Sequence, residues 1–322
     1  MATIETHGLR KTFRARSKTV PAVQALDLQV QSGEVFGLLG PNGAGKTTTM
    51  RMLATLLAPS GGQATVAGYD LLHQPGRVRA HIGYVGQAGG AEASATGREN
   101  LLLQAQLYGM GASAARARAA ELIGALDLLP FADRLVKSYS GGQRRRLDLA
   151  LGLAHRPMLL FLDEPTTGLD PQSRARLWEE VCRLRAAGTT IVLTTHYLDE
   201  ADALCDRLAI IDGGQLAGAG TPDALKSQIA GDLIALGIDT SSAVLARARD
   251  TLRAQPFVRE LHDTAQGILL YVEHGEEQLP IVLRLLDGAG MTIRTVTLAR
   301  PTLDDVFLRL TGRSLREPAP SA

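Results

Sequence analysis

A glycine-rich stretch at residues 40–48 has the residue types and spacing needed to bind phosphate groups. In order, it consists of Gly40, Pro41, Asn42, Gly43, Ala44, Gly45, Lys46, Thr47 and Thr48. Glycines allow backbone N–H groups to turn toward phosphate oxygens, and the start of a following helix adds a favourable field. In such a loop the lysine reaches the β- and γ-phosphates, and the next hydroxyl ligates Mg²⁺. The spacing predicts a nucleotide-phosphate site rather than an ordinary turn before a helix.

Two carboxylates, Asp163 and Glu164, follow a second apolar run at residues 158–162. An aspartate at the tip of a buried strand suits Mg²⁺ coordination, either directly or through water. The adjacent glutamate can polarise an attacking water molecule. Strands often end in acidic turn residues, so this pair alone is a weak signal. Beside a phosphate-binding loop it predicts a hydrolytic site.

A third stretch has a geometry that suits anion binding. Ser140, Gly141, Gly142 and Gln143 precede a helical segment that begins with three arginines. Serine is a good N-cap, and paired glycines expose backbone donors at a helix start. Taken by itself, this stretch is better explained as a flexible loop that caps a helix.

The elements that would hold these residues alternate between strand-like and helix-like patterns. Apolar runs at residues 35–39, 158–162 and 190–194 predict buried parallel strands. Apolar residues at helical spacing predict helices over 47–57, 101–108, 114–128 and 174–186. This alternation predicts an α/β fold with a mostly parallel sheet covered by helices.

The pattern starts again after about residue 220. A short helix over 222–229 precedes strands expected at 232–238, 257–262, 268–273 and 291–298, with a turn near Gln266. Helices are expected at 242–254, 276–287 and 302–310. The order βαββαβ is that of a ferredoxin-like fold. We therefore expect domains at 1–220 and 221–315, and a disordered Pro- and Ala-rich tail at 316–322.

Size and composition limit the possible classes of protein. The chain has 322 residues, of which 45% are hydrophobic, and this fits two folded domains. Its net charge of +1 does not indicate a general nucleic-acid-binding surface. Cys182 and Cys205 stand far apart, and we expect two buried or partly buried free thiols in a reducing cytosol. The polar start, MATIETHGLR, lacks signal-peptide features, and no apolar run reaches the ~20 residues of a membrane helix. We expect a soluble chain.

Six motifs occur in one order along the chain. They are GPNGAGKTT at 40–48, YVGQ ending at Gln87, SGGQRRR at 140–146, LLFLDEP at 159–165, TGLDP at 167–171 and TTH ending at His196. Over about residues 3–220 the set resembles the ATP-binding subunit of ABC transporters. The resemblance implies a P-loop ABC-type ATPase domain with a helical subdomain at about 88–155, to which the pattern after residue 220 adds a small C-terminal α+β domain. Its cofactors would be ATP and Mg²⁺.

The resemblance also implies a role for each matching residue. Lys46, Glu164 and His196 would be catalytic, with Glu164 as general base and His196 contacting the γ-phosphate. Thr47, Gln87 and Asp163 would surround the metal, and Gln87 would also sense a membrane partner. Phe13 would stack on adenine, although an aromatic residue this early is often simply part of a core. Ser140 and Gly142 would bind the γ-phosphate held by an opposite subunit, and Asp170 would lie at the dimer interface.

The implied assembly is a head-to-tail dimer that acts on a separately encoded membrane permease. One departure from the family is Tyr139, where leucine is more usual. Residues 300–312 are similar to the end of daunorubicin-resistance-type exporter ATPases, and related nodulation-type exporters end comparably. This ending favours export of a drug, antibiotic or lipid-like compound from the cytoplasmic side of the cell membrane, although its apolar residues also fit a last amphipathic helix.

Two other classes of function compete with export. A soluble ABC ATPase of chromosome structure or DNA repair would carry a long heptad-rich insertion or zinc-spaced cysteines, and neither is present. Translation types usually hold two ATPase units, whereas this chain has one P-loop motif. An importer subunit stays open as a third possibility, against which the exporter-like ending argues moderately.

Overall fold

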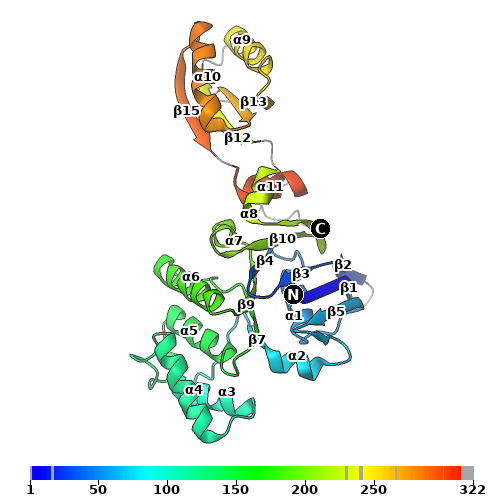
Figure 1. Cartoon of the computed structure of the whole chain (residues 1–322), viewed down its shortest axis with the longest axis vertical. Helices are drawn as coiled ribbons and strands as arrows, with labels where there is room; N and C mark the ends of the chain where they lie inside the picture. The colour runs from blue at the N-terminus through cyan, green and yellow to red at the C-terminus, as the bar shows by residue number, and fades with distance from the viewer. Residues whose placement is uncertain are drawn as a thin grey trace. The chain divides into compact units, whose positions relative to one another are not determined.

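The structure is a computed structural model that describes residues 2–15, 18–228, 231–238, 242–264, 267–299 and 301–312. The chain forms two compact units, a first that ends at Pro222 and a second that begins at Asp223. Each unit has its own sheets and helices (Figure 1). Of the sequence-based expectations, the turn residue Gln266, the helix end at Ile229, Arg300 and the tail at 316–322 lie outside the described residues.

A mostly parallel sheet forms the centre of the first unit. Its strands, in spatial order, are β11 (Gln215–Gly220), β10 (Arg207–Asp212), β4 (Val35–Leu39), β9 (Thr190–Thr195), β8 (Leu159–Asp163) and β7 (Ile82–Val85). Neighbours from β10 to β7 are parallel, and β11 pairs with β10 in the antiparallel direction. Strands β4, β8 and β9 are buried along their whole length, as expected for strands covered on both faces. The carboxyl ends of β4, β8 and β9 therefore lie side by side; the P-loop follows β4, Asp163 ends β8 and Thr195 ends β9.

An antiparallel sheet beside it was not predicted from the sequence. It contains β2 (Lys18–Leu26), β1 (Ala2–Ala15), β5 (Gly61–Val66) and β6 (Tyr69–Asp70), with β3 (Gln29–Gln31) also paired to β1. The long β1 strand changes register at several points, which breaks the alternation by which a half-buried strand is recognised.

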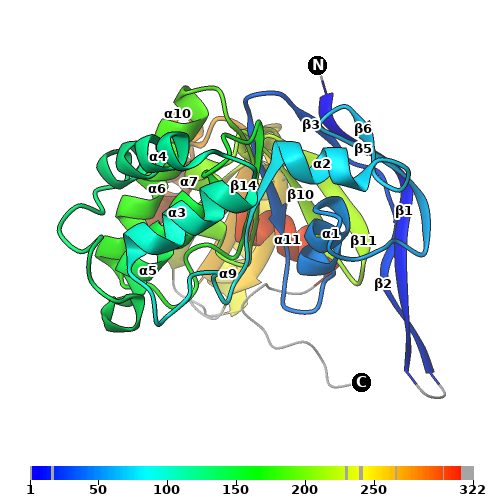
Figure 2. The same ribbon diagram turned by 90° about the horizontal axis from the view of Figure 1, so that it is seen from below.

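The helices of the first unit gather on the side away from this antiparallel sheet, except for α1 and α2 (Figures 1 and 2). They are α1 (Lys46–Leu53), α2 (Pro75–His81), α3 (Gly97–Leu107), α4 (Ala112–Ala125), α5 (Gly141–Gly152), α6 (Pro171–Ala186) and α7 (Leu198–Leu204). A single 3₁₀ turn, Val136–Ser138, precedes α5. Helix α1 ends four residues earlier than the predicted Leu57, because Thr55 adopts a left-handed φ of 60° that cannot continue a helix.

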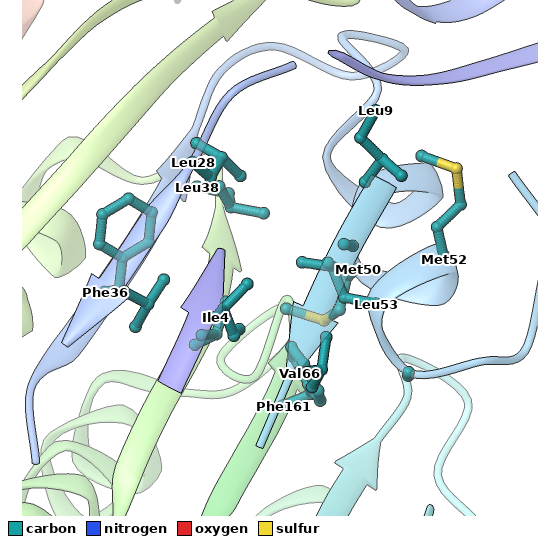
Figure 3. Packing of buried hydrophobic residues seen from close by; sticks show 14 of the residues in the cluster. Ile4, Leu9, Leu28, Phe36, Leu38, Met50, Met52, Leu53, Val66 and Phe161 are labelled. Carbon is teal, nitrogen blue, oxygen red and sulfur yellow. The ribbon is translucent and has the colours of Figure 1, made fainter. Parts of the chain in front are cut away.

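One apolar core joins both sheets to α1. Figure 3 shows Ile4 of β1, Val66 of β5, Met50 of α1 and Phe161 of β8 within this core, and Phe36 of β4 belongs to it as well. All five side chains are buried, and each such burial contributes roughly 1.5–3 kcal/mol. This packing fixes β4 and α1, the two elements between which the glycine loop hangs.

The second unit has the predicted βαββαβ order. It contains β12 (Asp232–Ile238), α9 (Ser242–Arg253), β13 (Val258–Thr264), β14 (Gly267–Val272), α10 (Gly275–Gly288) and β15 (Ile293–Ala299), with α8 (Pro222–Ser227) before them and α11 (Leu303–Thr311) after. The strands are antiparallel in the order β13-β14-β12-β15, which is the split arrangement of a ferredoxin-like fold. Buried residues of α9 and α10 pack on one face of this sheet.

The two cysteines are free, but they differ in exposure. Cys205 is buried, as expected, and its Sγ lies where a side chain at Gly37 of β4 would go. The expectation that Cys182 is buried or partly buried was wrong, because it is exposed. Cys182 follows the buried Val181 on α6 and faces solvent, because only one side of that helix packs on the sheet.

Candidate functional site

The glycine loop links the end of β4 to the start of α1, and its shape depends on glycine. Gly45 has φ 104°, and a Cβ there would lie 2.5 Å from the carbonyl oxygen of Ala22. A Cβ at Gly40 would lie 2.1 Å from the carbonyl oxygen of Ile211. Only glycine fits at both positions, which lets the backbone turn closely past its neighbours between β4 and α1.

A hollow of about 210 Å³ lies in this loop. Its walls are formed by Ala22, Asn42, Gly43, Ala44, Gly45, Lys46, Thr47, Thr48, Gln87 and Glu164. The structure thus brings Gln87 and Glu164, distant in sequence, to the P-loop. Gly40 and Pro41 lie at its base through the hydrogen bonds of Lys46. Concave surfaces with convergent backbone donors and a few charged groups are typical of ligand sites.

The Lys46 side chain lies under the loop and is 3% exposed. Its Nζ donates to the carbonyl oxygens of Gly40 at 2.7 Å and Pro41 at 2.9 Å, and lies 3.9 Å from Glu164 Oε1. Burial lowers the pKa of this ammonium, whereas the carboxylates of Glu164 and Asp163 act in the opposite direction. The ammonium therefore lies beside the loop hollow, between the loop carbonyls and Glu164.

Asp163 ends β8 as a fully buried carboxylate. Its Oδ1 accepts hydrogen bonds from Thr47 Oγ1 at 2.9 Å and Thr194 Oγ1 at 2.7 Å, and its Oδ2 accepts one from Tyr84 OH at 3.2 Å. The pKa of Tyr84 is raised, first by burial and then by the Asp163 charge. A hydroxyl and a carboxylate beside a phosphate loop form the hard oxygen donor set that Mg²⁺ prefers, with phosphates and waters completing its shell. The residues therefore fit this ion.

Glu164 has an unusual backbone conformation, with φ of 45° in the left-handed region. Its N–H donates to Thr194 Oγ1 at 2.9 Å, which ties the residue to β9. Its Oε2 accepts from Thr167 Oγ1 at 3.2 Å and lies 3.5 Å from His196 Nδ1. The carboxylate is thus flanked by Lys46 on one side and His196 on the other.

Ser140 caps α5 in a reciprocal arrangement with Gln143. Ser140 Oγ accepts from the Gln143 N–H at 3.3 Å, and Gln143 Oε1 accepts from the Ser140 N–H at 3.0 Å. Gly142 lies close to Ser173, where a Cβ would be 2.5 Å from Ser173 Oγ. Asp170 caps α6 in turn, and hydrogen bonds from Ser173 lower the pKa of its carboxyl.

Ser140, Gly142 and Gln143 of the SGGQ stretch border a separate hollow of about 150 Å³. Within the described part of the chain, none of the residues that line it lines the P-loop hollow. Ser140, Gly141 and Asp170 are exposed, in contrast to the buried Lys46 and Asp163. Phe13 is 42% exposed on β1 and contacts the Lys11 ammonium, 5.3 Å from its ring centre. Within one copy of the chain, Ser140, Gly142 and Gln143 are therefore not gathered with the P-loop, and Phe13 does not line its hollow.

Sequence reasoning missed several residues of this site. Ala22 supplies a wall of the hollow, and Tyr84 and Thr194 hold Asp163. Arg145 and Glu200 are buried beside the strand ends, and Trp178 Nε1 donates to Glu200 Oε1 at 3.2 Å. A signal for Arg145 existed: it lies three and four residues before Asp148 and Leu149, on the side of α5 that faces the core.

Two family models match the chain. Residues 23–167 match the model for ABC transporters, and residues 220–311 match the C-terminal domain of DrrA1-3-like ATP-binding proteins. The daunorubicin/doxorubicin resistance ATP-binding protein DrrA of Streptomyces peucetius is 45% identical over 96% of this chain and 92% of its own length.

The chain belongs to the ABC transporter ATP-binding proteins of the daunorubicin/doxorubicin resistance type. As a member of this family it is an ATP-binding, ATP-hydrolysing protein. The Nod factor export ATP-binding protein I of Burkholderia orbicola is similar too, with 42% identity over 92% of this chain and 93% of its own. This family assignment agrees with the exporter hypothesis and leaves the DNA-repair and translation alternatives without support.

Solved structures confirm the ABC ATPase fold. The chain resembles the dimeric, post-hydrolysis ATP-binding cassette MJ0796 bound to ADP and Pi, with a TM-score of 0.63 and 24% identity over 68% of this chain and 98% of that one. A second structure, an ATP-binding subunit of an ABC transporter, gives 0.62 and 28% identity over 70% of this chain and 92% of that one. Across the described residues, no helix has the length and apolar character needed to cross a bilayer.

Proposed function

We propose that this chain is the ATP-hydrolysing subunit of an ABC export system and drives a separately encoded membrane permease. The observation that carries the proposal is the convergence of Lys46, Thr47, Asp163 and Glu164 at the ends of β4 and β8. The 41–46% identity to proteins named for drug resistance, along 90–96% of the chain, supports export as the purpose of the hydrolysis.

The P-loop supplies the phosphate-binding half of the reaction. Its N–H groups and Lys46 would bind the β- and γ-phosphates, and their charge would stabilise the developing negative charge. Thr47 and Asp163 would hold Mg²⁺, which neutralises phosphate charge when bound, with Gln87 at the edge of the same hollow. Glu164 would accept the proton of the attacking water, and His196, beside that carboxylate, would contact the γ-phosphate.

The SGGQ stretch would supply the second half of the ATP site, and it would do so for the P-loop of another copy of the chain. Ser140, Gly142 and Gln143 border a hollow apart from the P-loop hollow and lie at the exposed start of α5. The dimeric assembly of a protein with the same fold supports pairing of two copies. In this arrangement ATP lies between the P-loop of one copy and the SGGQ of the second, Asp170 lies at the interface, and Phe13 stacks on adenine.

Export requires a membrane partner and a location at the membrane. Relatives include proteins named for daunorubicin or doxorubicin resistance and for Nod factor export, which supports a drug, antibiotic or lipid-like cargo. The chain would bind peripherally to its permease on the cytoplasmic side of the membrane, with residues 1–220 as the ATPase domain and 221–315 as an accessory domain.

Co-purification and ATP-dependent dimerisation test this proposal. A tagged chain extracted from its own cells in mild detergent should bring down a multi-span membrane protein, and the Glu164→Gln variant should form a dimer when ATP is added. A Ser140→Arg variant should lose the dimer and keep ATP binding, because the change affects only the second half of the site. Recovery of only soluble partners or ribosomes would contradict the transport role.

A further inference from the structure

Arg145 is a buried arginine whose guanidinium, within the described part of the chain, donates its hydrogen bonds to backbone carbonyl oxygens. It is 8% exposed and lies in the first turns of α5, two residues after Gln143 of the SGGQ stretch. Its Nε donates to the Pro165 carbonyl at 2.8 Å, its Nη1 to the Gly86 carbonyl at 2.7 Å and its Nη2 to the Asp163 carbonyl at 3.2 Å. Three acceptors from two separate segments thus meet on one planar group.

Two of those carbonyls belong to the residues on either side of Glu164. Glu164 is the residue with the left-handed φ of 45°, a conformation that is unfavourable for a side chain with a Cβ and persists only where the surroundings hold it. The Arg145 guanidinium holds the Asp163–Glu164 peptide group, directly before this residue, and the Pro165–Thr166 peptide group, one residue beyond it. The Glu164 N–H is fixed separately by Thr194 Oγ1. The backbone from which the Glu164 side chain projects is therefore held from outside its own segment.

The third carbonyl belongs to Gly86, directly before Gln87. One turn further along α5, Asp148 Oδ1 accepts from the N–H groups of Gly90 at 2.9 Å and Ala91 at 3.3 Å. Arg145 and Asp148 therefore hold the two ends of the segment 86–91, and Asp148 is itself only 5% exposed. A shift of this segment would move the guanidinium that also holds the Glu164 turn.

The arrangement requires arginine in particular. A guanidinium presents its donors in a rigid plane, whereas a lysine ammonium is a single point that cannot span three acceptors in this geometry. Burial lowers the pKa of Arg145, and the charges of Asp148 and Asp163 oppose this. A buried cation with backbone acceptors and nearby carboxylates satisfies its donors without facing solvent.

We propose that Arg145 is a positioning residue that fixes the orientation of the Glu164 carboxylate. Through Arg145, this orientation depends on the position of the segment 86–91. Arg145 does not take part in proton transfer itself. Release or displacement of that segment lowers the rate of ATP hydrolysis by letting the Glu164 turn relax. This inference rests on the proposed role of Glu164 as general base.

The first test is the steady-state ATPase activity of Arg145→Lys with Mg²⁺ and ATP. We expect kcat to fall about 10- to 100-fold with KM and ATP affinity within about twofold, because the P-loop is untouched while the base is misaligned. The matched control is Arg118→Lys. Arg118 also donates to backbone carbonyls of the α5 end, those of Leu153 and Ala154, but lies away from the Glu164 turn. It should keep normal kcat, and an equal loss in both variants would overturn the proposal.

A double-mutant cycle separates this inference from the proposed function. If Arg145 acts through Glu164, Arg145→Lys combined with Glu164→Gln should be no slower than Glu164→Gln alone. Multiplied losses would show that Arg145 acts elsewhere and would overturn the inference while leaving Glu164 as base. Normal turnover by Glu164→Gln alone would instead contradict the proposed function, and the inference with it.

Two further measurements distinguish positioning of Glu164 from a direct contact between Arg145 and nucleotide. Arg145 also borders the SGGQ hollow, so binding to nucleotide from a second copy is the competing role. Arg145→Lys in the Glu164→Gln background should still dimerise with ATP, and loss of the dimer would favour that competing role. In Arg145→Lys, the rate of amide hydrogen exchange should rise above the wild-type rate both in residues 86–91 and in residues 163–167. The exchange rate of the P-loop should not change. The proposal would be overturned if Arg145→Lys melted close to the temperature of Arg118→Lys and showed unchanged hydrogen exchange in both segments.

Discussion

The two units of this protein bury different kinds of side chain. In the described part of the chain, every buried polar or charged side chain precedes Pro222, including Lys46, Arg145, Asp163 and Glu200. The buried residues after it are apolar, as at Leu270 and Val282. Burial of a charged group costs free energy unless partners satisfy it, so a chain keeps such groups where chemistry requires them.

This difference separates a unit built for catalysis from a unit built for packing. In the first, loss of a buried polar group should alter turnover or affinity. In the second, loss of a buried apolar group should alter stability and leave the chemistry intact. Substitutions in both units can test this division, beginning with the largest expected effect.

Glu164→Gln should lower ATP turnover by roughly 10²- to 10⁴-fold, because the amide cannot accept a proton from water. ATP affinity should persist, since the P-loop contacts remain. Phosphate release and calorimetric titration with ATP measure the two quantities. As the matched control, Glu179→Gln on the exposed side of α6 should turn over normally.

Lys46→Ala should weaken ATP binding by about 10- to 100-fold, the range for loss of one hydrogen-bonding charge to a phosphate. The carbonyls of Gly40 and Pro41 also lose their donor. Calorimetric titration with ATP measures the affinity. Unchanged affinity would show that Lys46 is not part of the nucleotide site. It would also contradict the expectation that loss of a buried polar group in the first unit alters turnover or affinity.

Leu270→Ala should cost about 3 kcal/mol of stability through the cavity left in the second core. ATP affinity should stay within twofold of the wild-type value. Guanidinium unfolding followed by circular dichroism gives the stability. The partner variant Ile281→Ala changes a residue that is 40% exposed on α10 and should cost less than about 0.5 kcal/mol. A large loss of ATP affinity in Leu270→Ala would show that the division into units is wrong.

The smallest effect concerns His155, whose ring stacks on Tyr108 with centroids 3.7 Å apart. Burial lowers the pKa of His155, so the folded chain binds a proton there less readily than the unfolded chain. The unfolding free energy should therefore decrease as pH falls below about 6.5. His155→Gln should reduce this slope. Fluorescence of Trp178, the single tryptophan, follows the unfolding of the first unit. Equal slopes in wild type and variant would contradict the prediction.

Local patterns predicted much of the fold correctly. The strands at 35–39 and 232–238 begin and end where expected, and the second unit has the expected βαββαβ order. These predictions succeed because a buried strand is a continuous apolar run and an amphipathic helix has its own period. The antiparallel sheet around β1 was missed, because its pairings join residues 2–15 to residues 61–66 and its bulges interrupt the alternation.

The sequence by itself determined that the chain holds a phosphate loop, an acidic strand end and an SGGQ helix start, since each is a contiguous motif whose chemistry depends on neighbours in the chain. Tertiary structure alone decided how these motifs meet. Ala22 closes the P-loop hollow, Tyr84 and Thr194 hold Asp163, and Arg145 fixes the carbonyls around Glu164. These contacts join residues up to more than a hundred positions apart, as Thr47 and Asp163 show. The physical reason is that a hydrogen bond depends on the distance and angle between two groups, which only the packed sheet and helices fix.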